Sequence, residues 1–189
     1  GLPAHRKYFE GLGPSTLRAM KFDRSKSAVR RMLSGTQALY EPGTREVYSD
    51  LGFLLLEWVC EGVDGPLADR WQTLPCHGDD ALHFRPLPQG DAPEEIYLPT
   101  EDCPWRRRLL RGEVHDDNAW TMGGVCGHAG LFGNLESVLS AGRMWMLALR
   151  GEADLDEVQS ATIRKAVSRE MWMHKRGTRV LGCDTPTPG

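Results

Sequence analysis

Apolar residues recur at helical spacing in two segments of the first half of the chain. Between Arg24 and Leu33 the apolar side chains fall on one face of a helix, and Gly35 is placed to end it. Pro66 favours the start of a shorter helix that runs to about Leu74. Between the Arg24–Leu33 helix and the helix that starts at Pro66, a wider apolar stripe from Asp50 to Glu61 predicts a core helix. The stripe consists of Leu51, Leu54, Leu55, Trp58 and Val59.

The second half of the chain contains two more helical patterns and a long irregular stretch. Asn134 can cap a helix that runs to about Leu149, and another helix covers Asp156 to about Arg169. The core side chains expected on the first of these are Leu135, Val138, Leu139, Met144, Trp145, Met146 and Leu149. From Pro75 to Pro104 repeated prolines forbid long regular elements, so we expect a loop with room for one short strand. Residues 105–111 are expected to form one or two helical turns.

Composition and charge argue against a nucleic-acid-binding protein and against a membrane-spanning one. The chain of 189 residues is 40% hydrophobic and 26% charged, which is typical of a globular protein. A net charge of −3 excludes the basic face that nucleic-acid binding requires. The basic cluster at 106–111 is followed by acidic residues, so we interpret it as a solvated or salt-bridged face rather than a nucleic-acid patch. We find no apolar run long enough for a membrane span.

The cysteines and histidines indicate neither a disulfide framework nor a metal site. Five cysteines form no CxxC pair, which favours reduced structural thiols and, weakly, a cytoplasmic protein. Residues 115–117 with Cys126 and His128 lack any recognised ligand spacing. We therefore predict no metal and no cofactor.

A turn followed by a tyrosine precedes the helix predicted from Asp50. Pro42-Gly43 favours a tight turn, because proline fixes its own φ and glycine accepts a positive one. Tyr48 comes just before the helix, which either Ser49 or Asp50 can cap. A phenol held at a helix start is a candidate proton-transfer group. The alternative is a half-buried tyrosine that only packs there.

Several segments, in order along the chain, together resemble one family. Tyr48-x-Asp50 is similar to the Tyr-x-Asn motif of the penicillin-recognising serine hydrolases, and the ordered set resembles a branch related to class C β-lactamases, DD-peptidases and esterases. The resemblance covers most of the chain. The other matching segments are Gly1-Leu2-Pro3-Ala4, Pro42-Gly43-Thr44, Phe84-Arg85-Pro86, Pro99-Thr100-Glu101, Cys103-Pro104-Trp105-Arg106, residues 112–119, 123–125, 127–132 and 181–186.

The resemblance implies an α+β fold of the serine β-lactamase/DD-peptidase type. Its members have an antiparallel sheet flanked by helices, with a helical domain inserted. Residues 1–189 would be a single partial domain, mainly the helical part and its long loops. The family's Ser-x-x-Lys nucleophile segment and its Lys-Thr-Gly or His-x-Gly third motif would lie outside this range. We therefore expect this chain alone to be inactive and marginally stable, with an exposed apolar face.

The resemblance also implies a reaction and a set of site residues. The intact protein would cleave an amide or ester of a small-molecule or peptide acyl substrate through an acyl-serine, with Tyr48 as general base. Asp50 replaces the usual asparagine and cannot donate a hydrogen bond, which favours acyl substrates other than β-lactams or peptide amides. His115 and Asn118 are expected to order the long loop and to line the substrate pocket. We interpret the glycine-rich residues 127–130 as structural rather than as the third motif.

Two other interpretations remain open at this stage. The chain can be a non-catalytic module that binds cell-wall peptides or a protein partner, because Asp50 departs from the motif and no Ser-x-x-Lys is present. It can also be an unrelated helical domain whose resemblance is accidental. The sequence does not indicate an oligomeric state.

Overall fold

The structure is a computed structural model that describes residues 1–12, 21–74, 82–87, 92–168, 179–180 and 183–184. Its helices are η1 (Tyr8–Gly11, a 3-10 helix), α2 (Phe22–Ser34), α3 (Asp50–Asp64), α4 (Leu67–Trp71), α5 (Asp117–Thr121), α6 (Leu135–Arg150) and α7 (Glu157–Ala166). Its strands are β1 (His83–Phe84), β2 (Pro99–Cys103), β3 (Arg108–Arg111), β4 (Leu131–Phe132), β5 (Arg179–Val180) and β6 (Cys183–Asp184). Helices and small sheets are thus combined, as the α+β expectation requires.

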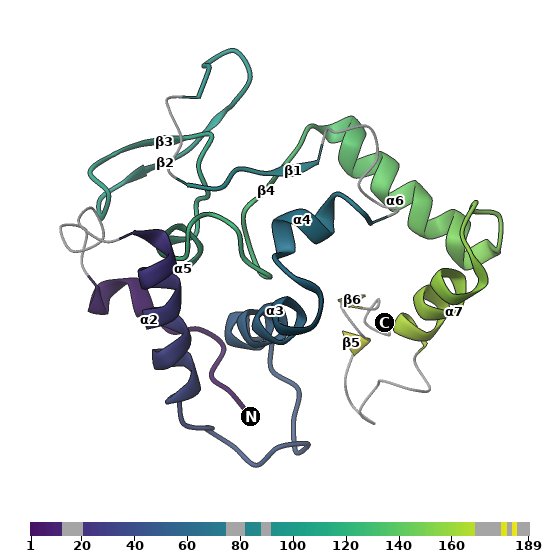
Figure 1. Cartoon of the computed structure of the whole chain (residues 1–189), viewed down its shortest axis with the longest axis horizontal. Coiled ribbons are helices and arrows are strands. Elements are labelled where there is room, and N and C mark those ends of the chain that lie inside the picture. Colours follow the sequence, from purple (N-terminus) through teal and green to yellow (C-terminus); the bar gives the residue numbers. More distant parts are fainter. Residues whose placement is uncertain (13–20, 75–81, 88–91, 169–178, 181–182, 185–189) are drawn as a thin grey trace, which may run out of the picture.

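Helix α3 lies near the middle of the molecule, with α2 on one side and the α6–α7 pair on the other (Figure 1). The buried core gathers around α3, because its apolar stripe packs against α2 and the segment that contains α5. The core residues are Tyr8, Val29, Leu33, Leu51, Leu54, Val114, Ala119, Met122 and Cys126. The two predicted N-terminal helices are confirmed. Of the stripe predicted on α3, Leu51 and Leu54 enter the core and Leu55 packs against it, whereas Trp58 and Val59 are 38% and 64% exposed.

Local signals in the sequence set several helix ends. Ser49 is the N-cap of α3 and its hydroxyl accepts a hydrogen bond from the amide of Gly52 at 3.3 Å. Asn134 caps α6 in the same way, as predicted, and Asp156 begins α7 with a capping box. Asp50 is therefore the first residue of α3 and not its cap, which leaves its carboxylate for another partner.

The described strands form three antiparallel pairs, β1 with β4, β2 with β3, and β5 with β6. The expectation of helical turns at 105–111 is wrong, because Arg108–Arg111 pairs with Pro99–Cys103 as a hairpin. The loop of this hairpin passes through Arg107, which has a positive φ of 56°. The described residues of the proline-rich stretch from Pro75 to Pro104 hold two short strands, β1 and β2, rather than the one expected.

The apolar stripe of α6 is largely exposed, which corrects the expectation that it is buried. Leu135, Val138 and Leu139 are 72%, 56% and 62% exposed, and Ala148 is the buried residue of this helix. The physical reason is that α6 packs mainly on α7. Exposed apolar side chains also occur on α3, at Leu56, Val59 and Val63. The predicted exposed apolar face is therefore present, whereas marginal stability stays a prediction.

The remaining expectations from composition can be compared with the described residues. Every helix in the described ranges is too short or too polar to cross a bilayer. Cys60, Cys103 and Cys126 are free thiols, and the last two are buried. Burial raises the pKa of the Cys126 thiol well above its ordinary value, so this group stays protonated and unreactive. The predicted helix from 156 ends earlier than expected, at Ala166.

Candidate active site

Tyr48 lies at the entrance to helix α3, where the sequence predicted it. Its side chain is about half exposed, at 49%, and its ring lies 5.9 Å from that of Phe53. It lines a hollow of about 200 Å³ whose walls are Val47, Tyr48, Ser49, Gly52, Phe53 and Leu56. The turn before it is formed as predicted, because the amide of Thr44 donates to the carbonyl of Glu41 and Gly43 has a φ of 78°. The phenol is therefore accessible to a small ligand.

Asp50 contacts the N-terminal segment of the chain rather than capping its own helix. Its Oδ2 lies 2.9 Å from Nδ1 of His5, and its backbone amide donates to the carbonyl of Ala4 at 2.9 Å. A carboxylate only accepts hydrogen bonds, so Nδ1 of His5 carries the proton in this contact. The pair is accessible from solvent, since the His5 side chain is 45% exposed and that of Asp50 is 19% exposed.

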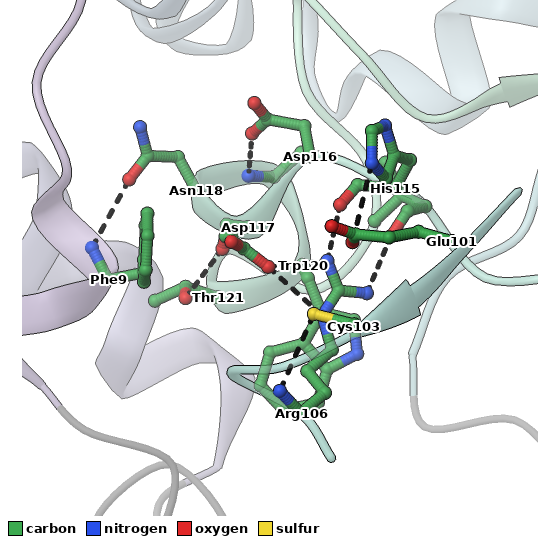
Figure 2. Close-up of polar contacts among 12 residues, drawn as sticks. Phe9, Glu101, Cys103, Arg106, His115, Asp116, Asp117, Asn118, Trp120 and Thr121 are labelled. Atoms are coloured by element: carbon green, nitrogen blue, oxygen red, sulfur yellow. Dashed lines mark hydrogen bonds and ion pairs between the residues drawn. The ribbon is translucent and has the colours of Figure 1, made fainter. Parts of the chain in front are cut away.

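Asn118 is buried, and both the oxygen and the nitrogen of its side-chain amide are hydrogen-bonded. Its Nδ2 donates to the carbonyl of Arg6 at 2.7 Å, and its Oδ1 accepts from the amide of Phe9 at 3.2 Å. Figure 2 shows this side chain pointing from α5 toward Phe9. The structure therefore connects Asn118 and Asp50 through the same short stretch of chain. Its expected role in lining the substrate pocket stays a prediction.

His115 lies on the loop before α5 and makes no hydrogen bond with the N-terminal stretch that links Asn118 to Asp50 in the described structure. Its side chain is 63% exposed, and its Nε2 lies 3.4 Å from a carboxylate oxygen of Glu101 on β2. Figure 2 shows the two side chains facing each other. His115 thus helps to hold the loop against the β2–β3 hairpin, and its exposure leaves it open to a ligand. Contact with substrate stays a prediction here too.

A buried arginine holds the loop that carries His115. The guanidinium of Arg106 donates to the carbonyl of Val114 at 2.8 Å, to the carbonyl of His115, and to Oδ1 of Asp117 at 2.7 Å (Figure 2). It also lies 5.4 Å from the centre of the Trp120 ring. The basic cluster is therefore salt-bridged, as predicted, and one member is an internal clamp with a side chain that is 2% exposed.

Asp116 and His128 form a second histidine–carboxylate pair next to α5. Asp116 caps this helix by accepting from the amide of Ala119 at 2.7 Å, and its Oδ1 lies 3.0 Å from Nε2 of His128. Burial by itself raises the pKa of Asp116, but the bonds from His128 and Ala119 outweigh it and hold the pKa below its ordinary value.

The glycine-rich segment at 127–130 packs closely against α3. A Cβ on Gly127 would lie 2.7 Å from the carbonyl oxygen of Phe53, and its amide donates to the buried carboxylate of Glu57 at 3.0 Å. Glu57 is further paired with Lys26 at 2.8 Å and with Arg30 at 3.3 Å, both on α2. These contacts favour the structural interpretation of the segment. Sequence reasoning missed Glu57; the signal that could have found it is a carboxylate that interrupts the apolar stripe of α3.

Sequence reasoning missed His5, because no spacing relates it to Asp50. Among the residues that the structure describes, no group of three or more His, Cys, Asp or Glu side chains is arranged to hold a metal ion. The candidate site is the Tyr48 hollow, together with the His5–Asp50 pair at the start of the same helix.

Comparison with known proteins gives matches along most of the chain. The profile of the family described as Beta-lactamase matches residues 5–186. A protein of Salmonella agona (strain SL483), named "Putative D-alanyl-D-alanine carboxypeptidase", is 33% identical over 131 residues, which are 62% of this chain and 30% of that protein. Proteins of the same name from Salmonella paratyphi B (strain ATCC BAA-1250 / SPB7) and Salmonella newport (strain SL254) are 34% identical over 125 residues, 59% of this chain and 29% of each. The chain spans about 30% of the length of these relatives. No solved structure matches it.

Proposed function

Because this chain belongs to the Beta-lactamase family of serine hydrolases, we propose that its protein cleaves an amide or ester bond through an acyl-serine intermediate, with Tyr48 as general base. Residues 1–189 contain no Ser-x-x-Lys, so the proposal assigns the nucleophile to sequence outside them. Residues 1–189 then act as one partial domain that supplies the tyrosine side of the site.

The observation that carries the proposal is the setting of Tyr48. It is half exposed beside a hollow of about 200 Å³ and directly precedes a helix N-terminus. A free tyrosine has a pKa of about 10, so it accepts a proton at neutral pH only where cations stabilise the phenolate. In the proposal, the lysine that follows the serine provides that cation, and Tyr48 takes the proton of the serine hydroxyl.

The substrate is a peptide or small acyl compound. The relatives' name, D-alanyl-D-alanine carboxypeptidase, supports a D-alanyl peptide. Asp50, in contrast, offers no donor to a substrate amide and is engaged with His5, which supports an ester or another acyl compound. In either case we keep substrate contact for the exposed His115 and, as a prediction, for Asn118, although both sides of the Asn118 amide are already bonded to the backbone.

A Tyr48→Phe variant of the intact protein tests the assigned base. This change removes only the phenolic oxygen, and general-base catalysis contributes about 10²- to 10⁴-fold. We expect labelling by a fluorescent fluorophosphonate, and by a fluorescent penicillin where it occurs, to slow by about 100-fold or more. Tyr40→Phe, which changes a tyrosine on the loop before the same turn, is the matched control and should label normally. Normal labelling of Tyr48→Phe would refute the role.

A non-catalytic module is the second candidate, and the unusual Asp50 is the observation that favours it. Such a protein would bind a muropeptide or a D-alanyl dipeptide without turning it over. Measurable binding by calorimetry, with no covalent labelling of the intact protein, would support this candidate over the hydrolase.

A further inference from the structure

We propose that His5 is a positioning residue for Tyr48, acting through a short N-terminal stretch that holds the start of α3. This stretch, Pro3–Phe9, is called the anchor segment below. The inference rests on the proposed function for its catalytic consequence, while its structural part can be measured separately. His5 does not line the Tyr48 hollow, so its effect is indirect.

Three contacts join the first half of the anchor segment to the residues after Tyr48. The hydroxyl of Ser49 donates to the carbonyl of Pro3 at 2.7 Å, and the amide of Asp50 donates to the carbonyl of Ala4 at 2.9 Å. Nδ1 of His5 then donates to Oδ2 of Asp50 at 2.9 Å. Ser49 and Asp50 follow Tyr48 directly, so these bonds fix the backbone that carries its ring.

The second half of the anchor segment is held by the core. Asn118 binds it at two points, the carbonyl of Arg6 and the amide of Phe9, and is itself almost fully buried. The hydroxyls of Tyr8 and Thr36 lie 2.7 Å apart, and the Phe9 ring packs edge-on to Trp105 at 4.8 Å. The Arg6–Phe9 end of the segment is therefore bonded to and packed against the core. The Pro3–His5 end is bonded to the start of α3, so the segment fixes the position of this helix end relative to the core.

His5 is the link in this connection that can be changed without disturbing the core. Its side chain is 45% exposed, whereas Asn118 is 1% exposed. Removing the His5 imidazole leaves the carboxylate of Asp50 without this donor, so that only the bonds from Ser49 and from the amide of Asp50 hold the end of the segment nearest Tyr48 in the described structure.

Catalysis depends on this position because reacting groups must be aligned closely. A misplacement of about 1 Å can lower a rate by about 100-fold. Loss of the His5 bond is therefore expected to slow acylation without weakening the overall fold. Asparagine can restore it, because the amide nitrogen of an asparagine side chain is a donor that stands in for Nδ1.

The test compares His5→Ala, His5→Asn and the control Lys7→Ala in the intact protein. Lys7 is an exposed member of the same segment, and its side chain pairs only with Glu10 in the described structure, at 3.2 Å. Two quantities are measured: the rate of covalent labelling by a fluorophosphonate, over a range of reagent concentrations, and amide hydrogen exchange of the peptide that covers residues 47–53.

For His5→Ala we expect exchange at the amides of Asp50 and Gly52 to accelerate and the maximal labelling rate to fall by about 10- to 100-fold. The reagent concentration at half-maximal rate and the melting temperature should stay near those of the Lys7→Ala control. His5→Asn should restore both exchange and labelling to within about threefold of the original protein.

Failure of this inference and failure of the proposed function give different results. If the original protein is labelled but His5→Ala matches it in exchange and in labelling, the positioning role is refuted and the hydrolase stands. Faster exchange in His5→Ala with unchanged labelling also refutes the role. If the original protein is not labelled, while exchange rises in His5→Ala and recovers in His5→Asn, the structural link is supported and the hydrolase assignment fails.

Discussion

Replacement of Arg106 by lysine changes the clamp that holds the loop before α5. The lysine keeps the positive charge but loses the planar fork of donors that only arginine has. In the structure, this fork binds Val114 and His115 through their carbonyls and Asp117 through its carboxylate. One ammonium group cannot reach all three, so we expect at least one of these buried acceptors to lose its partner.

The expected loss of stability follows from the number and the burial of these bonds. A hydrogen bond to a charged group contributes about 1.5–3 kcal/mol, and the Arg106 side chain is 2% exposed, so solvent does not replace a lost bond. Losing one to two of them gives a destabilisation of about 3 kcal/mol. That is a large part of the total of about 5–15 kcal/mol that is typical of a domain. Alanine at this position would also leave Asp117 without its cation, and is expected to cost about 3–5 kcal/mol.

Urea unfolding of the intact protein, followed by tryptophan fluorescence, measures this effect. With a slope of about 2 kcal/mol per molar, a loss of about 3 kcal/mol lowers the midpoint by about 1.5 M. Trp120 lies on the guanidinium of Arg106 and reports the site directly. Arg107→Lys, at the exposed neighbouring position, is the control and should stay within about 0.5 kcal/mol. An Arg106→Lys midpoint as close to the original as that of the control would show that the buried fork does not hold the loop.

Two further predictions concern Asp116 and Gly127. The pKa of Asp116 is held below its ordinary value of 3.8, so its contribution to stability is present above pH 3.8 and is lost as pH falls through the lower pKa of the folded state. Asp116→Asn should therefore be less stable than the original protein near pH 6, with the difference shrinking in acid; a difference that grows on acidification would contradict this. Gly127→Ala should destabilise by about 1–3 kcal/mol in thermal melts, because its Cβ would meet the Phe53 carbonyl oxygen at 2.7 Å; an unchanged melting temperature would show that the close contact is absent.

The sequence by itself determined the features that depend on neighbouring residues. Ser49 was a candidate cap of α3, and Asn134 was predicted to cap α6; both do so because a short polar side chain satisfies amides of its own first turn. The turn at Pro42-Gly43 follows from the φ preferences of these two residues. Tyr48 was singled out in the same way, from its place between a turn and a helix.

The predictions that failed depend on pairing or packing partners outside the segment itself. Residues 108–111 form a strand because residues 99–103 pair with them, and nothing within the segment indicates that partner. The stripe on α6 has the periodicity of a buried face, yet exposure depends on what packs against it, and in the described structure α7 covers only part. Periodicity defines a face of a helix and does not say whether that face is covered.

The candidate site likewise combines residues that are close in sequence with contacts between residues that are far apart. Tyr48 and Asp50 are close in sequence, so a motif suffices to find them. The bond from His5 to Asp50 spans 45 positions, and that from Asn118 to Phe9 spans 109. Contacts at such separations leave no periodic pattern, because they form only when the core brings the start of α3, the anchor segment and α5 together. The sequence therefore identified the candidate proton acceptor, and the tertiary structure alone decided which residues hold it in place.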